Sequence, residues 1–232
     1  MIKAKISEIF KSIQGEGVYA GIPQVFIRFH GCCINCDFCD TRNLSFKEYS
    51  LGSLIKEINK FKHSYHSLAL TGGEPLMHKD FLREVLPLLK KYKRTIYLET
   101  NGTLPESLKE IIKYIDIIAM DFKLPSSTKR NSFWREHSEF LSIAATKNVF
   151  TKAVICSTTK FSDLITAIEI LKENIRHRRT RLGREKNIPL ILQPNFHQDE
   201  ALKKAFLFQD KCLNYWDDVR VIPQLHKYIG AK

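Results

Sequence analysis

Residues 24–41 read Q-V-F-I-R-F-H-G-C-C-I-N-C-D-F-C-D-T. The apolar run over residues 24–29 is rich in β-branched and aromatic side chains, which predicts a buried strand, and the glycine and cysteines behind it predict a loop. Further along the chain, other short apolar runs are also followed by polar loops. We therefore interpret this stretch as the first of several strand and loop units, and its loop holds four of the six cysteines of the chain.

Six more short apolar runs predict strands, and stretches with apolar residues three and four apart predict helices. The further strands are expected at residues 67–70, 94–99, 115–121, 150–155, 188–193 and 219–222, and helical spacing is found over residues 51–61, 82–89 and 164–171. Alternating strands and helices are typical of a parallel sheet, because parallel neighbours need crossover connections. We predict one α/β domain over residues 1–232, with six or seven parallel strands in a doubly wound open sheet or a full or partial (β/α) barrel.

The composition fits a folded protein of ordinary size. The chain has 232 residues, of which 44% are hydrophobic, and its 37 Lys and Arg against 25 Asp and Glu give a net charge of +12. These values exclude a disordered chain or a disulfide-stapled miniprotein. The positive charge would suit nucleic-acid binding, but residues 172–186 alone hold seven Lys or Arg and two Glu. We interpret that segment as a solvated loop on the rim opposite the cysteines, and we expect no direct binding of nucleic acid.

The sequence shows no sign of export or membrane insertion. Residues 1–10 mix charged with apolar side chains, unlike a signal peptide, and no run approaches the ~18 apolar residues of a membrane span. We expect a cytoplasmic protein without a membrane partner. In a reducing compartment, four cysteines within residues 32–39 are more typical of metal binding or redox chemistry than of disulfides. Cys156 and Cys212 stand alone, and we expect both to be ordinary small side chains.

Three of the clustered cysteines, Cys32, Cys36 and Cys39, have the spacing C-x3-C-x2-C. Three thiolates on one short loop can hold three irons of a cubane cluster and leave the fourth iron open to a small molecule. Two other interpretations remain: a zinc site, which would need a fourth ligand such as Cys33 or His30, and a C-x-x-C redox pair. Cys33 also leaves the register open, because Cys33, Cys36 and Cys39 are spaced C-x2-C-x2-C.

Four more polar segments follow predicted strands. They are T-G-G-E-P (71–75), E-T-N-G-T (99–103), D-F-K-L-P-S-S (121–127) and Q-P-N (193–195). In a parallel sheet the carboxyl ends of the strands lie at one edge, and ligands bind at that edge. We therefore expect these segments and the cysteine loop to form one site.

The cysteine loop, with Phe38 before its last cysteine, resembles the signature of the radical S-adenosylmethionine (SAM) enzymes, and T-G-G-E-P resembles their glycine-rich loop. More narrowly, six segments together resemble the 7-carboxy-7-deazaguanine synthases. They are S-I-Q-G-E-G (12–17), F-I-R (26–28), C-D-T (39–41), E-T-N-G (99–102), D-F-K-L-P-S-S and P-Q-L-H-K (223–227). The cysteine spacing alone indicates only the superfamily, whereas the six segments in this order are specific. Cys33 is not part of the pattern, and family precedent favours Cys32 as the ligand.

The resemblance implies a fold, two cofactors and the residues that hold them. The fold would be a partial or modified (β/α) barrel with about six parallel strands. A cluster loop at 30–42 would hold a [4Fe–4S] cluster through Cys32, Cys36 and Cys39. SAM would be bound by Phe38, Cys39, Asp40, Gly72, Gly73, Glu99, Asp121, Phe122 and Lys123. Gly72 and Gly73 have no side chain and would permit a close approach of SAM to the backbone. The alternative for Glu99 is a strand-end carboxylate paired with a neighbouring lysine.

The implied reaction converts 6-carboxy-5,6,7,8-tetrahydropterin into 7-carboxy-7-deazaguanine and ammonia, a lyase-type ring contraction in queuosine precursor biosynthesis. A SAM-derived radical would remove a hydrogen, so no protein side chain is expected as a catalytic group. The substrate would be bound by Gln14, Gly15, Glu16, Arg28, Thr71 and Lys232. A segment at 219–232 would close over it.

Three of these polar residues suit such a substrate by their chemistry. The planar guanidinium of Arg28 can make two parallel hydrogen bonds to a carboxylate. Glu16 can accept from N–H groups of the pterin edge, and Gln14 can both donate and accept. The alternatives are a surface strand residue for Arg28 and a solvated turn for Gln14 and Glu16.

The resemblance also implies Mg²⁺ bound at Thr41, a flavodoxin- or ferredoxin-type electron donor and a homodimer. Without it, Thr41 would be interpreted as a helix cap or turn residue. Two other functions fit parts of the sequence. One is a glycyl-radical-enzyme activase that uses the same cluster and SAM, and the other is a basic, metal-containing RNA-binding module.

Overall fold

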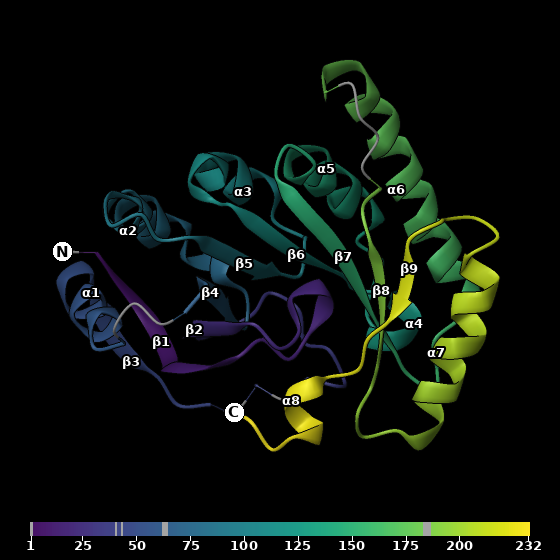
Figure 1. Ribbon diagram of the computed structural model, residues 1–232, viewed down its shortest axis with the longest axis horizontal. Coiled ribbons are helices and arrows are strands. Elements are labelled where there is room, and N and C mark those ends of the chain that lie inside the picture. Colours follow the sequence, from purple (N-terminus) through teal and green to yellow (C-terminus); the bar gives the residue numbers. More distant parts are fainter. Residues whose placement is uncertain (1, 40, 43, 62–64, 183–186) are drawn as a thin grey trace.

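In the computed structural model, nine strands of the described residues form one sheet in the order β3-β1-β2-β4-β5-β6-β7-β8-β9 (Figure 1). The structure describes residues 2–39, 41–42, 44–61, 65–182 and 187–232, and the side chains among them outside 175–182. The strands are β1 (Lys3–Ile13), β2 (Pro23–Phe29), β3 (Lys47–Ser50), β4 (Ser67–Gly72), β5 (Ile96–Thr100), β6 (Ile117–Phe122), β7 (Asn148–Ile155), β8 (Leu190–Pro194) and β9 (Val219–Val221). Strands β2 and β4 to β9 are parallel, whereas β1 pairs antiparallel with both β2 and β3.

The seven parallel strands are the seven that the sequence predicted, and that prediction is confirmed. The sequence analysis missed β1 and β3. Residues 3–6 alternate exposed and buried side chains, but the register of β1 on β2 shifts between Ile6 and Glu8 and interrupts the alternation. Strand β3 is only four residues long, and its first two side chains, Lys47 and Glu48, are exposed.

The longer helices lie on one face of the sheet, and the strands β3 and β9 end it without pairing to each other within the described residues (Figure 1). The arrangement is therefore an open partial barrel, not a doubly wound sheet. The helices are α1 (Leu51–Asn59), α2 (Lys79–Lys91), α3 (Pro105–Ile111), α4 (Pro125–Thr128), α5 (Trp134–Ala144), α6 (Phe161–Leu182), α7 (Asp199–Cys212) and α8 (Leu225–Tyr228), with single 3-10 turns η1 (Gly17–Tyr19), η2 (Pro75–His78) and η3 (Ile112–Tyr114).

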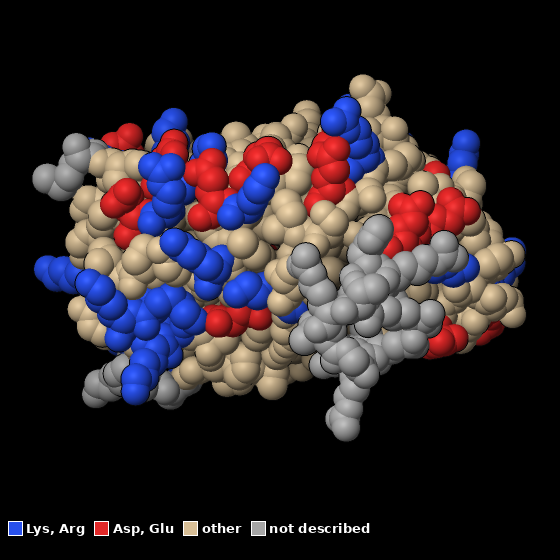
Figure 2. Space-filling view, turned by 90° about the horizontal axis from the view of Figure 1, so that it is seen from above, with Lys and Arg blue, Asp and Glu red and all other residues tan. Residues whose placement is uncertain are grey.

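The basic segment 172–186 differs from its prediction. Helix α6 continues to Leu182, so the expected loop is wrong for residues 172–182. Lys, Arg and Glu are good helix formers, and no Gly or Pro interrupts the helix before its end. Residues 183–186, and the side chains from 175 onward in this segment, lie outside the described part. On the face seen in Figure 2, Lys and Arg lie among Asp and Glu.

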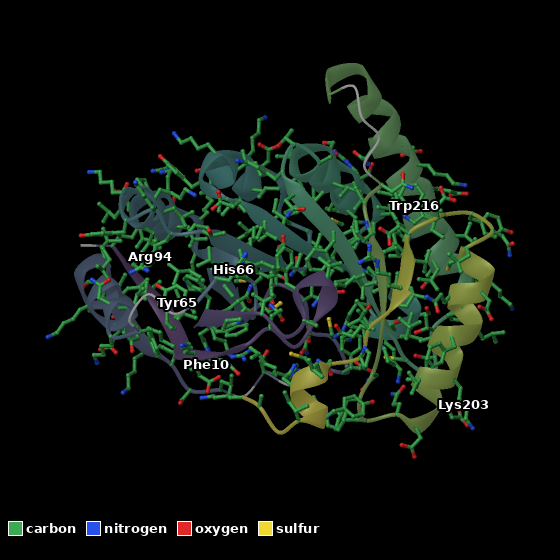
Figure 3. The ribbon with its side chains drawn as sticks, in the orientation of Figure 1. Phe10, Tyr65, His66, Arg94, Lys203 and Trp216 are labelled. Carbon is green, nitrogen blue, oxygen red and sulfur yellow. The ribbon has the colours of Figure 1, made fainter. Side chains whose placement is uncertain are left out.

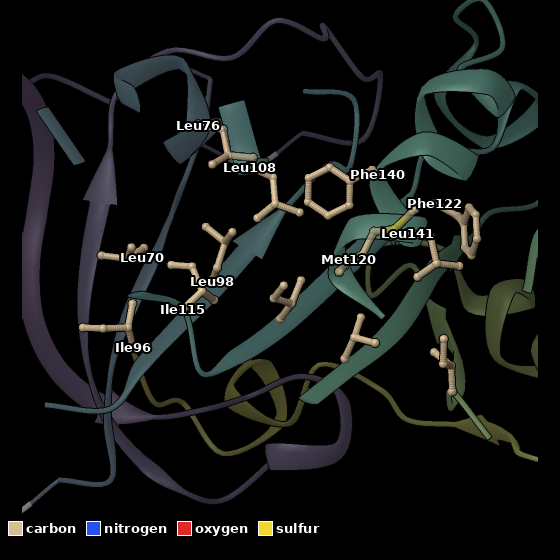
Figure 4. Close-up of a cluster of buried hydrophobic side chains, with 14 of the residues drawn as sticks. Leu70, Leu76, Ile96, Leu98, Leu108, Ile115, Met120, Phe122, Phe140 and Leu141 are labelled. Atoms are coloured by element: carbon tan, nitrogen blue, oxygen red, sulfur yellow. The ribbon is translucent and has the colours of Figure 1, made fainter. Parts of the chain in front are cut away.

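The main core lies between the sheet and these helices. Outward side chains of the strands, such as Leu70, Leu98 and Met120, pack there against Leu108 of α3 and Phe140 of α5 (Figure 4). Each fully buried side chain of this size contributes roughly 1.5–3 kcal/mol to folding. The helices thus hold the strands in place from one side of the sheet. The other face of the sheet is not covered by these helices and can line a cavity.

The inner face of the sheet changes character along the strands. Near the amino ends lies a small apolar cluster of Phe26, Ala69, Tyr97, Ile117, Ala119, Phe150 and Ile191. Phe10 of β1, labelled in Figure 3, stacks on Phe26 with ring centroids 5.1 Å apart and covers one side of this cluster. Towards the carboxyl ends the inner positions become polar. Within the described residues, no helix is long and apolar enough to cross a membrane.

Candidate functional site

A cavity of about 620 Å³ lies at the carboxyl edge of the parallel strands, on the face opposite the helices. Inner side chains of the strands, the cysteine loop and the C-terminal segment form its walls. The predicted site residues that line it are Gln14, Gly15, Glu16, Arg28, Cys32, Cys36, Phe38, Cys39, Thr41, Thr71, Gly72, Gly73, Glu99, Asp121, Lys123 and Lys232. The structure therefore brings together residues spread over nearly the whole chain. Asp40 lies outside the described residues.

Glu99, at the end of β5, accepts two hydrogen bonds. Gln14 donates through Nε2 to Oε1 at 2.7 Å, and Thr71 donates through Oγ1 to Oε2 at 2.6 Å. The same Gln14 amide donates to Gln24 Oε1 at 2.9 Å. Gln14 is therefore a buried member of a hydrogen-bond network, and the alternative of a solvated turn is wrong for it. The alternative for Glu99 was a strand-end carboxylate paired with a neighbouring lysine. Its hydrogen-bond donors among the described residues are instead the Gln14 amide and the Thr71 hydroxyl.

Glu16 forms a partly buried ion pair with Lys152, a residue that the sequence analysis missed. Gln224 also donates to Glu16, with Nε2 2.7 Å from Oε1. Burial alone would raise the pKa of Glu16, but the charge of Lys152 and the hydrogen bonds from Lys152 and Gln224 lower it to about 2. For Lys152, burial alone would lower the pKa. The neighbouring carboxylates, Glu16 foremost, outweigh burial and raise the pKa of Lys152 above its ordinary value. A lysine inside the apolar run of β7 is the sequence signal that could have revealed this pair.

Arg28 and Lys232 meet at Glu8, a second residue that the sequence analysis missed. Arg28 Nε donates to Glu8 Oε2 at 2.9 Å, and Lys232 Nζ lies 2.5 Å from Glu8 Oε1. Both cations also lie over the ring of Phe10, at 5.6 and 4.8 Å from its centroid. The side chain of Arg28 is only 21% exposed, so the alternative of an ordinary surface strand residue does not describe it.

Asp121 near the end of β6 and Lys123 just after it lie two residues apart. Lys123 Nζ donates to Asp121 Oδ2 at 2.8 Å. Asp121 Oδ1 and Gln193 Oε1 are both buried without a hydrogen-bond partner among the described residues, and both side chains line the cavity. Phe122 lies between Asp121 and Lys123 in the sequence, but its side chain packs in the core on the helix side of the sheet. The prediction of Phe122 as a ligand contact therefore cannot concern its side chain, because strand residues alternate between faces.

Three of the four cysteines of the loop line the cavity. Cys32, Cys36 and Cys39 line it, whereas Cys33 does not. Cys33 instead lies against Thr103 Oγ1 at 3.5 Å and receives a hydrogen bond from Asn101 Nδ2 at 3.3 Å. In the described part of the chain, no three His, Cys, Asp or Glu side chains converge as a single metal ion requires. Three cysteines of one loop beside a cavity match the three protein ligands of a cubane cluster with an open iron, whereas a structural zinc site needs a fourth protein ligand.

Two cations hold the backbone of this loop. Arg130 donates through Nε to the carbonyl oxygen of Asn35 at 2.5 Å and pairs with Asp37 at 3.0 Å. Arg42 donates to the carbonyl oxygen of Cys36. Thr41 lines the cavity and lies with Oγ1 3.6 Å from Cys39 Sγ. The loop is thus anchored through its carbonyl groups, which leaves its thiols available.

The glycines of T-G-G-E-P are needed for contacts inside the protein. A Cβ on Gly73 would lie 1.8 Å from the carbonyl oxygen of Gly31, just before the first clustered cysteine. Gly72 has φ +127°, and a Cβ there would lie 2.2 Å from the carbonyl oxygen of Phe29. The close approach expected at these positions is therefore made by the backbone that leads into the cysteine loop.

The C-terminal segment packs on the S-I-Q-G-E-G segment. Leu225 N donates to the carbonyl oxygen of Gly15 at 2.8 Å, and a Cβ on Gly15 would lie 1.8 Å from His226 Nδ1. Ala231 and Lys232 at the end of the chain also line the cavity. Two segments from opposite ends of the sequence thus form one wall.

We predict that Gly73→Ala lowers the midpoint of thermal unfolding by several degrees, because the new methyl group would displace the Gly31 backbone. The matched control is Gly52→Ala in α1, where nothing lies within 4 Å of the added Cβ and alanine is the better helix former. Differential scanning fluorimetry should find the control unchanged or more stable. Equal midpoints for the two variants would contradict the close approach.

We also predict that acid weakens the fold through Glu16. Its pKa lies at about 2 in the folded protein against an ordinary 4.5, so its stabilising effect is complete above about pH 4.5 and is lost as the pH falls towards 2. Urea unfolding of Glu16→Gln should therefore show a large loss of stability at pH 7 and a smaller one at pH 3. Glu57→Gln, in an exposed pair with Lys60, should lose under about 1 kcal/mol at either pH.

Comparison with known proteins agrees with this architecture. The model of the radical SAM superfamily matches residues 26–184. The 7-carboxy-7-deazaguanine synthase of Geobacter sulfurreducens is 34% identical over 98% of this chain and 97% of its own length, and that of Archaeoglobus fulgidus is 30% identical over 100% of both. The crystal structure of QueE from Escherichia coli shares the fold, with a TM-score of 0.64, 22% identity and coverage of 97% of this chain and 96% of that chain. The chain belongs to the radical SAM superfamily and, within it, to the 7-carboxy-7-deazaguanine synthase family.

Proposed function

We propose that this protein converts 6-carboxy-5,6,7,8-tetrahydropterin into 7-carboxy-7-deazaguanine and ammonia, as a step towards queuosine. The observation that carries the proposal is that the segments shared with the synthase family converge on one cavity. The same cavity is lined by three cysteines, by the Arg28 guanidinium and by the carboxylates of Glu16 and Asp121, which are each paired with a lysine. These groups suit the binding of a cluster and of a small carboxylated heterocycle. An activase for a partner protein would not need these buried polar groups, and no observation in the described residues favours an RNA-binding module.

A [4Fe–4S] cluster would be held by Cys32, Cys36 and Cys39. The donor set fits, because three thiols of one loop line the cavity and leave one corner of a cubane for another ligand. When bound, the cluster and SAM supply the one-electron cleavage and the hydrogen abstraction that start the reaction. The protein then contributes binding, orientation and exclusion of water.

SAM would lie between the cluster loop and the ends of β4 to β6. We assign to it the neighbourhood of Phe38, Cys39, Asp40, Gly72, Gly73, Glu99, Asp121 and Lys123, with Phe122 contributing at most its backbone. The unpartnered oxygens Asp121 Oδ1 and Gln193 Oε1 support a ligand with several O–H or N–H donors, because a buried acceptor left without a donor is costly. Glu99 keeps accepting capacity, since each carboxylate oxygen has two lone pairs.

The pterin would lie on the side of β1, β2 and the C-terminal segment. Arg28 uses Nε for Glu8, which leaves its terminal nitrogens to donate to the substrate carboxylate. Glu16 stays ionised beside Lys152 and would accept from N–H groups of the heterocycle. Gln14, Gly15, Thr71 and Lys232 complete this assignment, with the segment 219–232 closing over the substrate.

Four further elements belong to the same proposal. Mg²⁺ would be bound through Thr41 and a substrate carboxylate oxygen, since Mg²⁺ prefers hard oxygen ligands and keeps several waters. A flavodoxin- or ferredoxin-type protein would deliver the electron. A homodimer and a cytoplasmic location are the expected state of the enzyme.

The proposal is tested by anaerobic iron–sulfur reconstitution followed by product analysis with SAM, a chemical reductant and 6-carboxytetrahydropterin. We expect 7-carboxy-7-deazaguanine and ammonia, with a rate that falls after chelation and recovers with Mg²⁺. Formation of 5′-deoxyadenosine without a deazaguanine would keep the superfamily chemistry and contradict the assigned substrate. A rate that chelation leaves unchanged would contradict the magnesium assignment alone.

Cys32 and Cys33 should differ sharply as alanine variants. We expect Cys32→Ala to lose cluster binding and product formation, whereas Cys33→Ala keeps both, because only Cys32 lines the cavity. Iron and sulfide analysis with electron paramagnetic resonance (EPR) measures the difference. Loss of the cluster in Cys33→Ala would show that the C-x2-C-x2-C register is the correct one.

A further inference from the structure

A buried polar network lies directly behind the cysteine loop. Its centre is Asn101 of the E-T-N-G-T turn, only 4% exposed. Asn101 N donates to Glu74 Oε2 at 2.8 Å, and Glu74 N donates in turn to the carbonyl oxygen of Gly31 at 2.8 Å. His137 Nε2 donates to the carbonyl oxygen of Asn101 at 3.0 Å. Asn101 and Glu74 therefore join the turn after β5, the turn after β4 and the start of the cysteine loop.

The side chain of Asn101 has its orientation fixed. Its Oδ1 accepts from Thr103 N at 3.0 Å and from Thr103 Oγ1 at 2.7 Å. Because both of these partners donate, the oxygen must face Thr103 and the NH₂ group must face away from it. That NH₂ group points at the adjacent sulfurs, with Nδ2 3.3 Å from Cys33 Sγ and 3.8 Å from Cys32 Sγ.

We infer that Asn101 is a positioning residue for the iron–sulfur cluster, whose side-chain amide donates to the Cys32 sulfur and raises the reduction potential. The inference rests on the proposed function, because it takes Cys32 as a cluster ligand. Reduction by a low-potential one-electron donor adds negative charge to the cluster and its sulfurs, and an N–H donor stabilises that form more than the oxidised form. Asn101 itself is only 4% exposed, so its amide is held in this orientation toward the sulfurs.

The same amide explains how one of two adjacent cysteines is selected. Asn101 and Thr103 hold Cys33 outside the cavity, while Cys32 lines it. One hydrogen of the NH₂ group is available to each sulfur. The turn thus holds Cys33 through the side chains of Asn101 and Thr103, while the Cys32 sulfur lies against the Cys33 thiol and the Asn101 amide.

The test compares Asn101→Ala with His137→Phe in the reconstituted protein. Both changes remove a hydrogen bond of the same buried turn, but only Asn101 touches sulfur, and a phenyl ring fits among the aromatic neighbours of His137. We measure the midpoint potential by EPR-monitored redox titration, normalised to iron content, together with the thermal midpoint. We expect the ratio of reduced to oxidised cluster at a fixed potential to fall about tenfold in Asn101→Ala, a shift of about 59 mV for one electron, and to stay within about twofold in His137→Phe.

Each outcome bears on the inference. An unchanged potential in Asn101→Ala with full iron content overturns it. An equal shift in His137→Phe also overturns it, because the position of the turn and not the amide would then matter. Cys33→Ala must leave the potential unchanged, since a shift there would mean that the amide acts through Cys33. If Asn101→Ala loses iron while His137→Phe retains it, positioning of Cys32 by the amide is supported. A wild-type protein that binds no cluster would instead contradict the proposed function.

Discussion

Side chains alternate between the two faces of a strand, and the organisation of this molecule depends on that constraint. In the central parallel strands most outward residues are apolar and pack against the helices, while the inward residues near the carboxyl ends are largely polar. Since all parallel strands point the same way, their polar inward residues meet at one edge. Arg28, Thr71, Glu99 and Lys152 come from four strands and reach one cavity for this reason.

The charges in the cavity are arranged in pairs. Glu16 with Lys152, Arg28 with Glu8, and Asp121 with Lys123 each place opposite charges in hydrogen-bond contact. An unpaired charge removed from water would cost several kcal/mol, so the pairs allow ionised groups to remain partly buried next to a ligand. The pairing with Lys152 keeps Glu16 ionised over the physiological pH range, because it lowers the pKa of that carboxyl to about 2. The net charge of +12 for the chain says nothing about this local balance, in which cations and carboxylates are matched.

Several residues of the sequence motifs have structural roles that the motifs themselves did not predict. The glycines of T-G-G-E-P permit the close passage of the chain before the cysteines. Glu74 of the same motif is buried and accepts hydrogen bonds from its own turn, at Leu76, and from the neighbouring turn, at Thr100 and Asn101. Burial raises the pKa of Glu74 to about 7, against the effect of three hydrogen bonds that favour its ionised form. These motifs therefore shape the site as well as contributing to it. A side chain such as Phe122, placed between two cavity residues in sequence, supports the site from the opposite face of its strand.

The sequence by itself determined the parallel strands, the edge where a ligand binds and most residues of the cavity, because these follow from local apolar runs and from the polar segments behind them. It did not reveal β1 as a strand, because a register shift interrupts its alternation, nor the roles of Glu8 and Lys152, because their partners lie far away in the chain. The cysteine spacing also could not decide whether Cys32 or Cys33 lines the cavity. Only the tertiary structure placed Cys32 at the cavity and Cys33 against Asn101 and Thr103, since that choice depends on contacts with a turn about 70 residues away.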